Sequence, residues 1–321
     1  MKGLFIFPIK FSLLIFILLL IGCAGQSGVG EGVNVGKSGG YADGWDAYEK
    51  GDYAIALKEW EPLAEQGDAS GQYGLGYLYH KGHGVQQDYK IALEWFTLAA
   101  EQGNANAQNN LGLMYAKGQG VTQDYKVAFK WYTLAAEQGY AQAQYSLGVM
   151  YSKGRGVTQD YKAAIKWYTL AAEQGFANAQ NGLGFMYNNG LGVVQNYNTA
   201  LKWYKLAADQ GYAKAQYNLG HMYRQGQGVT QDYKAAVKWY KLAAEQGKAE
   251  AQVNLGLMYA EGNGVTQDNT RAFMWWNIAA SQGTKEAAVN LGMVQNEMTP
   301  AQIEKAQDLA RQCIAKNYKD C

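Results

Sequence analysis

The feature that most constrains this chain is a short motif that returns every 36 residues. One copy reads Leu111-Gly112-Leu113-Met114-Tyr115. Copies begin at Leu75, Leu111, Leu147, Leu183, Leu219 and Leu255, with a weaker one at Leu291. Each of the first six is followed by a tryptophan: Trp95, Trp131, Trp167, Trp203, Trp239 and Trp275. A unit this short cannot bury its own apolar face, so neighbouring units must stack and share a continuous core.

The unit from Asn104 to Gly139 shows how the pattern predicts helices. In its first half, Ala107, Leu111 and Tyr115 fall at i, i+4 and i+8, which places them on one side of a helix. A Gly-x-Gly-Val segment beginning at Gly118 then ends that helix, because glycine readily takes the positive φ needed just past a helix terminus. This segment lacks the lysine of a phosphate-binding loop, and no strand precedes it.

The second half of the unit predicts a helix that begins after Asp124. The Asp124 carboxylate can accept hydrogen bonds from the first free backbone N–H groups of that helix. The residues expected on its apolar side are Tyr125, Ala128, Trp131, Leu134 and Ala135. Two antiparallel helices per unit, stacked in series, predict an all-α fold: an α/α superhelical solenoid of stacked helical hairpins.

Both ends of the array depart from the repeat. Residues Asp46–Gly67 are expected to form a first hairpin that turns at Gly51-Asp52. Near the other end, Thr299-Pro300-Ala301-Gln302 combines a capping residue, a proline suited to the first helical turn, and a glutamine that completes a capping box. We therefore expect a solenoid over residues 44–298, with six full repeats at 68–283 and a partial one after them. Residues 299–321 should form a cap helix over its last open face.

Residues 1–22 have the pattern of a signal peptide. Lys2 and Lys10 are basic, and the apolar run Phe11–Ile21 leads to small residues. A permanent membrane anchor is the alternative, although a spanning helix needs about 20 apolar residues. The run Leu20-Ile21-Gly22-Cys23 resembles the bacterial lipobox, in which the cysteine is acylated and becomes the new first residue. An incidental cysteine at a cleavage site is the other interpretation.

The lipobox resemblance implies export and lipid attachment at Cys23. Ala24 follows the cysteine, where lipoproteins retained at the inner membrane tend to carry aspartate, so we expect the outer membrane, facing the periplasm. Residues 23–43 would then hold the acylated cysteine and a tether, because Ser27–Gly40 is rich in glycine and serine and has no apolar period.

Cys313 and Cys321 are the two cysteines that remain. In an oxidising compartment a disulfide between them is favoured over free thiols, and a metal site would need further ligands. Asn317 lies between them and tolerates a helix-ending conformation, so the chain can fold back to join the two sulfurs.

The units resemble Sel-1-like repeats, a subfamily of the tetratricopeptide-like α/α repeats. The resemblance rests on the run Ala-x-x-x-Leu-Gly-x-Met-Tyr, the Gly-x-Gly-Val turn and the helix Asp…Ala-x-x-Trp-Tyr-x-x-Ala-Ala-x-Gln-Gly, and it covers Asp68–Gly283. It implies a curved superhelix with the first helices on the concave side, and a role in protein–protein contacts or complex assembly, often at bacterial envelopes. Some cysteine-rich members, linked to peptidoglycan or β-lactam binding, carry a cysteine pair in every unit. These repeats have none, so that activity is not carried over.

The sequence shows no catalytic, cofactor-binding or metal-binding set. His80-x-x-His83 falls short of the three or four ligands that metal sites use, so both histidines are expected to be exposed turn residues. The chain has no Gly-x-Ser-x-Gly elbow or Ser-x-x-Lys motif, and its recurrent aspartates, such as Asp124 and Asp160, are expected to be helix caps. A net charge of +1 without a basic cluster argues against nucleic-acid binding.

Positions that differ between units mark the candidate binding surface. Residues held fixed across units should pack in the core, whereas those that vary are free to face a partner. The varying positions of one first helix are spaced i, i+4, i+7 and i+11, which makes a second stripe on that helix. The candidate residues are Tyr77, Lys81, Asn106, Asn110, Leu113, Lys117, Ser146, Val149, Phe185, Asn218, His221, Asn254 and Leu257. An apolar centre with polar flanks suits a peptide or a helix lying in a groove. Drift on a solvated face is the alternative.

The leading hypothesis is a non-enzymatic, monomeric scaffold, anchored by lipid in the bacterial envelope, that binds a protein or peptide in its concave groove. Two alternatives stay open. One is a factor that binds or modifies peptidoglycan, and the other is a host-interaction factor if the protein reaches the cell surface. A spacer without any partner is a third class of function.

Overall fold

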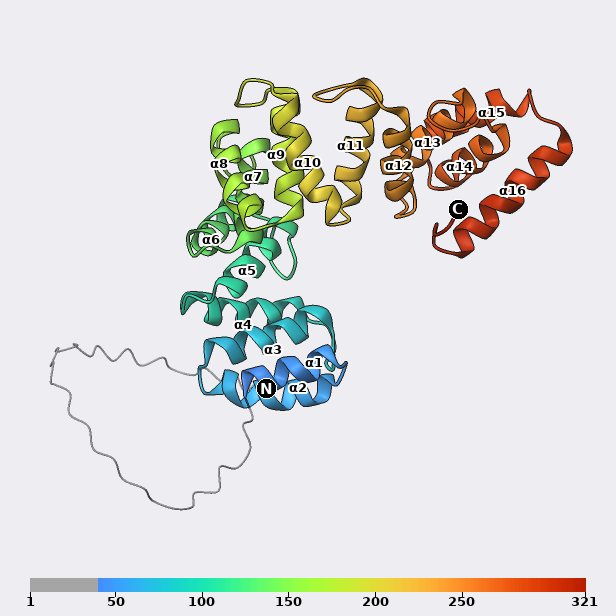
Figure 1. Ribbon diagram of the computed structural model, residues 1–321. Helices are drawn as coiled ribbons and strands as arrows, with labels where there is room; N and C mark the ends of the chain where they lie inside the picture. The colour runs from blue at the N-terminus through green and yellow to red at the C-terminus, as the bar shows by residue number, and fades with distance from the viewer. Residues whose placement is uncertain (1–39) are drawn as a thin grey trace, which may run out of the picture. The chain divides into compact units, whose positions relative to one another are not determined.

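The computed structural model describes residues 40–321, and the structural statements below concern that part of the chain. It contains sixteen helices and no strand (Figure 1). The helices are α1 (Tyr41–Glu49), α2 (Tyr53–Glu65), α3 (Ala69–Lys81), α4 (Tyr89–Glu101), α5 (Ala105–Lys117), α6 (Tyr125–Glu137), α7 (Ala141–Lys153), α8 (Tyr161–Glu173), α9 (Ala177–Asn189), α10 (Tyr197–Asp209), α11 (Ala213–Gln225), α12 (Tyr233–Ala244), α13 (Ala249–Glu261), α14 (Asn269–Ser281), α15 (Lys285–Gln295) and α16 (Pro300–Ala315). Consecutive helices pair as hairpins that pack in series, which confirms the all-α solenoid. The proposed signal peptide and Cys23 lie outside the described residues.

The turns and caps of each hairpin form as the repeat predicts. Helix α5 ends at Gly118, whose φ is 69° and whose N–H donates to the Met114 carbonyl. Helix α6 begins after Asp124, whose Oδ1 accepts from the backbone N–H of Lys126 at 2.8 Å and of Val127 at 3.1 Å. These interactions involve residues close in sequence, so each hairpin can be specified locally.

A glycine in each first helix lets the second helix approach closely. A methyl group placed on Gly112 of α5 would lie 2.7 Å from the ring of Tyr132 in α6. The same position in the other units is Gly76, Gly148, Gly184, Gly220 and Gly256, and each faces an aromatic ring of its own hairpin. The glycine therefore fixes the distance between the two helices of a unit.

The apolar side of the second helices differs from the sequence expectation. In α6 the buried side chains are Ala128, Tyr132, Ala135 and Ala136, whereas Leu134 is 44% exposed. Trp131 is half-buried and contacts the cluster formed by α4 and α5. The predicted apolar side of α6 was therefore wrong by one residue position. Tyr132, and not Trp131, is buried against Gly112, and Trp131 lies at the edge of the interface with the preceding unit.

Pairs of glutamines join neighbouring helices at one end of every unit, and the sequence analysis did not single them out. Gln180 of α9 is buried, and its Nε2 donates to the Ala172 carbonyl in the last turn of α8 at 3.2 Å. Its Oε1 accepts from Nε2 of Gln210, directly after α10, at 2.8 Å. One side chain therefore bridges three helices. The other glutamine pairs are Gln72–Gln102, Gln108–Gln138, Gln144–Gln174, Gln216–Gln246 and Gln252–Gln282.

The first helices lie on the inner side of the array. In addition to the contacts within and between hairpins, α1 contacts α3, α7 contacts α9, and α13 contacts α15. The second helices α2, α4, α6, α8, α10, α12 and α14 do not make comparable contacts with the next second helix along the chain. Helices that approach one another more closely lie on the inside of a curved stack, so the first helices are on the inner side at these three places.

The N-terminal hairpin starts earlier than expected. Helix α1 begins at Tyr41, inside the segment predicted to be a tether. Tyr41 is held by α2, because Nε1 of the buried Trp60 donates to the Tyr41 carbonyl at 3.1 Å. The expected turn is present, with Gly51 at a φ of 84°.

Helix α16 forms where it was expected, but it covers a different surface. Thr299 and Gln302 make the predicted capping box, and Pro300 occupies the first turn. The helix packs on α14, where it covers Ile278, instead of on the open side of α15 (Figure 1). The reason lies in α14: Met274 takes the position that lysine holds in α6, α8, α10 and α12, so the outer side of α14 is apolar.

Candidate functional site

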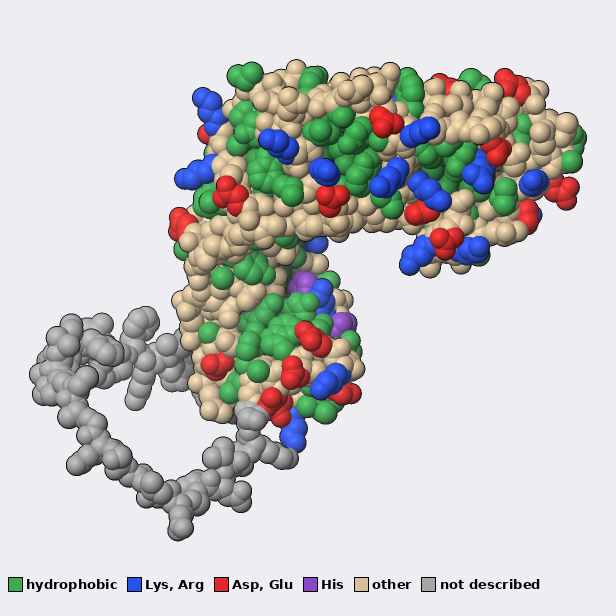
Figure 2. Space-filling model, viewed as in Figure 1, with side chains coloured by type: hydrophobic (Ala, Val, Ile, Leu, Met, Phe, Trp, Pro, Cys, Tyr) green, Lys and Arg blue, Asp and Glu red, His purple; other side chains and the backbone are tan. Residues whose placement is uncertain are grey.

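The thirteen candidate residues all lie on first helices, from α3 to α13, and none is buried. We call the surface that they form the inner face. Its most exposed large apolar side chain is Phe185 of α9, with 50% of its area open to solvent. Figure 2 shows apolar side chains gathered in separate patches along the repeats, with lysine and arginine between them. The structure thus brings the candidate residues to one side of the array.

The inner face is hollowed between α7 and α9. A pocket of about 510 Å³ lies there, and its lining includes two candidate residues, Val149 and Phe185. Tyr145, Asn178 and Asn181 line it as well, and they are not among the thirteen. The Tyr145 ring is positioned by Phe176, with ring centroids 5.5 Å apart. Aromatic and aliphatic groups form much of the pocket, and its polar groups include the two asparagine amides, the Ser152 hydroxyl and the Lys153 ammonium group.

A second pocket of about 200 Å³ continues this hollow toward α5 and α6. It shares Tyr145 and Val149 with the first pocket, and adds Ser146, Tyr132 and Arg155. Burial raises the pKa of Tyr132 to about 12, so its hydroxyl stays protonated at neutral pH. The two pockets share Tyr145 and Val149, and their linings offer hydroxyl and amide groups and the cationic side chains of Lys153 and Arg155 around an apolar centre.

The N-terminal part of the inner face is aromatic. Tyr77 lies 5.5 Å from Trp45 and 5.4 Å from Tyr48, measured between ring centroids. Nζ of Lys81 lies 5.4 Å from the Tyr77 ring, in a cation–π contact. Burial raises the pKa of Tyr48 well above its usual range. Tyr77 and Lys81 were among the predicted binding residues. Trp45 and Tyr48 were not, because the prediction compared equivalent positions of the repeats and the first hairpin departs from the repeat.

The C-terminal part is polar, and its side chains contact one another. Nδ2 of Asn218 donates to Oδ1 of Asn181 at 3.0 Å, and Nη1 of Arg224 donates to Oδ1 of Asn254 at 3.2 Å. Burial, and then the charge of Arg224, lower the pKa of His221. His221 is therefore neutral at physiological pH, and the positive charge in this part belongs to Arg224.

Comparison with known proteins shows the family. The Sel1 repeat model matches six consecutive segments: residues 69–104, 105–140, 141–176, 177–212, 213–248 and 249–284. The chain belongs to the Sel1 repeat family.

Three solved structures are among those to which this chain is similar. A Sel1 repeat protein from Oxalobacter formigenes is 35% identical, with a TM-score of 0.70, over 74% of this chain and 96% of that one. A protective antigen of uropathogenic Escherichia coli with the same repeat is 27% identical, with a TM-score of 0.33, over 87% of this chain and 85% of that one. An immunity protein from Pseudomonas aeruginosa is 23% identical, with a TM-score of 0.44, over 68% of this chain and 83% of that one. Among curated proteins no match is found.

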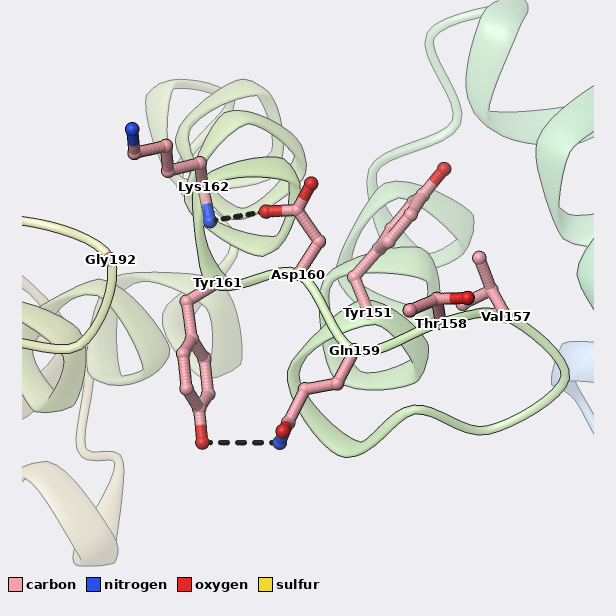
Figure 3. Close-up of a pocket in the computed structure, with 8 residues that line it drawn as sticks. All are labelled: Tyr151, Val157, Thr158, Gln159, Asp160, Tyr161, Lys162 and Gly192. Atoms are coloured by element: carbon pink, nitrogen blue, oxygen red, sulfur yellow. Dashed lines mark hydrogen bonds between the residues drawn. The ribbon is translucent and has the colours of Figure 1, made fainter.

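The hairpin turns of this Sel1 repeat protein form pockets of their own (Figure 3). One, of about 490 Å³, is lined by residues that include Tyr151, Gln159 and Asp160. An equivalent pocket lies three units later, around Tyr259 and Asp268. In Figure 3 the Asp160 carboxylate accepts from the backbone N–H of Lys162 at 2.8 Å, which is the capping interaction. Because a pocket of the same kind recurs at another turn, the geometry of the repeat accounts for it.

The histidines of α3 and its turn are more buried than expected. Nδ1 of His83 lies 2.8 Å from the Tyr48 hydroxyl, and its ring stacks on Tyr53 with centroids 4.4 Å apart. His80 packs against Phe96, and burial lowers its pKa. Both side chains are half-buried packing residues and not exposed turn residues. Within residues 40–321 no group of three or more His, Cys, Asp or Glu side chains is arranged to hold a metal ion.

Two further findings concern the membrane and the cysteines. None of the helices from α1 to α16 combines the length and apolar character needed to cross a membrane. The structure brings Cys313 and Cys321 together as a disulfide, with Cα atoms 5.5 Å apart. Asn317, between them, takes a positive φ of 51°, and the Tyr318 N–H donates to the Cys313 carbonyl at 2.8 Å.

Proposed function

We propose that this Sel1 repeat protein is a non-enzymatic scaffold that binds a protein or peptide along its inner face. Proteins of this family generally serve as scaffolds for protein interactions. The observation that carries the proposal is the pocket between α7 and α9, because part of its lining, including Tyr145, Val149 and Phe185, differs from unit to unit. A surface needed only for stacking would keep the same residues in every unit.

The lining of the pocket indicates what it would bind. Phe185, Val149 and Tyr145 form an apolar wall that suits a bulky aliphatic or aromatic side chain. The amides of Asn178 and Asn181 each carry a donor and an acceptor, which suits the peptide groups beside that side chain. The ligand that fits best is a peptide segment with one large apolar anchor.

A photocrosslinking amino acid at Phe185 should capture this partner in cells. The same group at Leu170 is the matched control, because Leu170 is also exposed but lies on the second helix α8, away from the pocket. We expect one product from position 185 that is absent from position 170 and is lost when Val149→Asp is added. Equal capture from both positions would contradict binding at the inner face.

The proposal places the scaffold in the bacterial envelope, attached through lipid at Cys23 and facing the periplasm. The support is the lipobox and the residue that follows it, Ala24. Metabolic labelling with a fatty acid should mark the protein and not its Cys23→Ala variant, since the thiol is the acylated group. A label of equal intensity on the variant would contradict lipid attachment at Cys23. The proposal of partner binding at the inner face would not depend on that result.

A peptidoglycan-binding or modifying factor is the competing function. A pull-down with purified peptidoglycan, combined with a hydrolysis assay, separates the two. If the protein is a scaffold, peptidoglycan should not retain it through the inner face in the pull-down. The protein should also release no wall fragments in the hydrolysis assay. Wall binding that Phe185→Ser abolishes, together with turnover, would overturn the scaffold proposal.

A further inference from the structure

Helix α15 is a first helix without a second helix. In the preceding unit, a methyl group placed on Gly256 of α13 would lie 2.5 Å from Nε1 of Trp276 in α14. Gly292 holds the same position in α15, and a methyl group there would meet nothing within 4 Å. Five further units repeat the arrangement of α13 and α14, with Phe96, Tyr132, Tyr168, Tyr204 and Tyr240 as the aromatic residues. The position that each of these rings fills is therefore empty at α15.

The open side of α15 carries apolar side chains around this glycine. Val289 is 63% exposed and Met293 is 59% exposed, and with Gly292 they form an i, i+3, i+4 stripe. Val253, the counterpart of Val289 in α13, is only 5% exposed because α14 covers it. In each complete unit the second helix closes the glycine position of this surface, whereas the counterparts of Met293, such as Phe185, stay partly or largely exposed.

The C-terminal helix does not cover this stripe. Helix α16 follows α15 but packs on α14 (Figure 1). Ala310 and Cys313 of α16 share one buried cluster with Ile278 of α14. Tyr318 and Cys321, which follow the helix, pack against the same cluster, and the disulfide joins Cys321 to Cys313 of the helix.

The two end units have a tryptophan at this position. In α2 and α14 its indole donates to a carbonyl of the facing first helix, three residues before the glycine. Nε1 of Trp60 donates to the Tyr41 carbonyl at 3.1 Å, and Nε1 of Trp276 to the Val253 carbonyl at 2.9 Å. The equivalent acceptor in α15 is the carbonyl of Val289.

We propose that the open side of α15 is a docking site for an amphipathic helix of a partner protein, with a tryptophan opposite Gly292. The indole N–H donates to the Val289 carbonyl, and the flanking apolar residues cover Val289 and Met293. A second copy of this chain is not the occupant, because in residues 40–321 every second helix is already packed in its own hairpin and α16 is held on α14. Val289 and Met293 hold the repeat positions of Asn181 and Phe185, so this site continues the line of the inner face at the C-terminal end of the array.

A synthetic peptide with the sequence of residues 269–281 serves as the probe, because it carries the α14 surface that covers α13. Fluorescence anisotropy with the labelled peptide and the purified protein should show saturable binding. Hydrogen exchange should show new protection confined to residues 285–295. The Trp276→Ala peptide should bind at least tenfold more weakly, since it cannot fill the position at Gly292.

Two protein variants complete the test. Gly292→Phe should fill the position from within and weaken peptide binding at least tenfold, while its thermal unfolding stays close to that of the parent, because Gly292 touches nothing in the folded chain. Leu170→Ser, on the second helix α8 and outside both sites, should leave peptide binding unchanged. The proposal is overturned if the peptide does not bind saturably or if Gly292→Phe binds it as well as the parent. It is also overturned if residues 285–295 are already protected in a dimer of the protein alone.

Discussion

Replacing Gly184 with alanine should destabilise the protein by about 1–3 kcal/mol. The new methyl group would lie 2.6 Å from the ring of Tyr204, which is 2% exposed and has no space into which to move. The two helices of the unit would have to separate, which also weakens contacts with both neighbouring units. Urea denaturation followed by circular dichroism measures the change in the free energy of unfolding.

Gly292→Ala is the matched control, because it makes the same chemical change at the same position of a repeat. No second helix covers Gly292, so the substitution should only raise helix propensity and stabilise α15 by up to about 1 kcal/mol. Opposite signs at the two glycines would show that the cost at Gly184 comes from crowding. A loss of equal size at both positions would contradict the packing described for α15.

Reduction of the disulfide between Cys313 and Cys321 should lower the free energy of unfolding of the C-terminal end by roughly 2–3 kcal/mol, as expected for so short a closed loop. The loop holds Asn317, Tyr318 and Asp320 at positive φ values, which residues other than glycine rarely adopt. Without the cross-link these residues can relax, and Tyr318 then leaves its contact with Gly247.

Hydrogen exchange on the oxidised and reduced protein measures this effect. We expect faster exchange in α16 after reduction and unchanged exchange in α7 and α8, because units of a solenoid interact only with their neighbours. The Cys321→Ser variant should behave like the reduced protein. Equal protection of α16 in both forms would leave the disulfide without a structural role.

Most of the fold was predictable from sequence because the repeat encodes local interactions. The glycine after α5 and the cap at Asp124 act within one turn of their own helices, so their positions in the sequence fixed where the helices end. The rotation of the second helices was harder to predict. Trp131 and Tyr132 are adjacent, and which of them is buried depends on the helices of two units at once.

The position of α16 had a signal that the sequence analysis did not use. Its amphipathic pattern predicted a helix, but not the surface on which it would pack. The clue lies in α14, where Met274 replaces the lysine of the units before it. An apolar residue on an otherwise charged stripe indicates that something covers it.

The candidate site was predicted in part. Comparing units separated packing residues from exposed ones, and Val149 and Phe185 indeed line the main pocket. Tyr145 and Asn181 were missed although their position also varies, because it lies beside the core at the edge of the chosen stripe. The contact between Asn218 and Asn181 joins two units. It depends on the angle between the units, which the sequence of a single unit does not predict.

The turns set how this protein can change its length. A methyl group placed on Gly120, whose φ is 71°, would lie 2.5 Å from the carbonyl oxygen of Tyr89, so each turn fits against the second helix of the unit before it. Inserting or removing a few residues would break that fit, whereas removing residues 141–176 would join Tyr140 to Ala177, which occupies the same place in its unit as Ala141. The length of the array can therefore change to suit a longer or shorter partner only by complete hairpins, through gene duplications or deletions of whole 36-residue units.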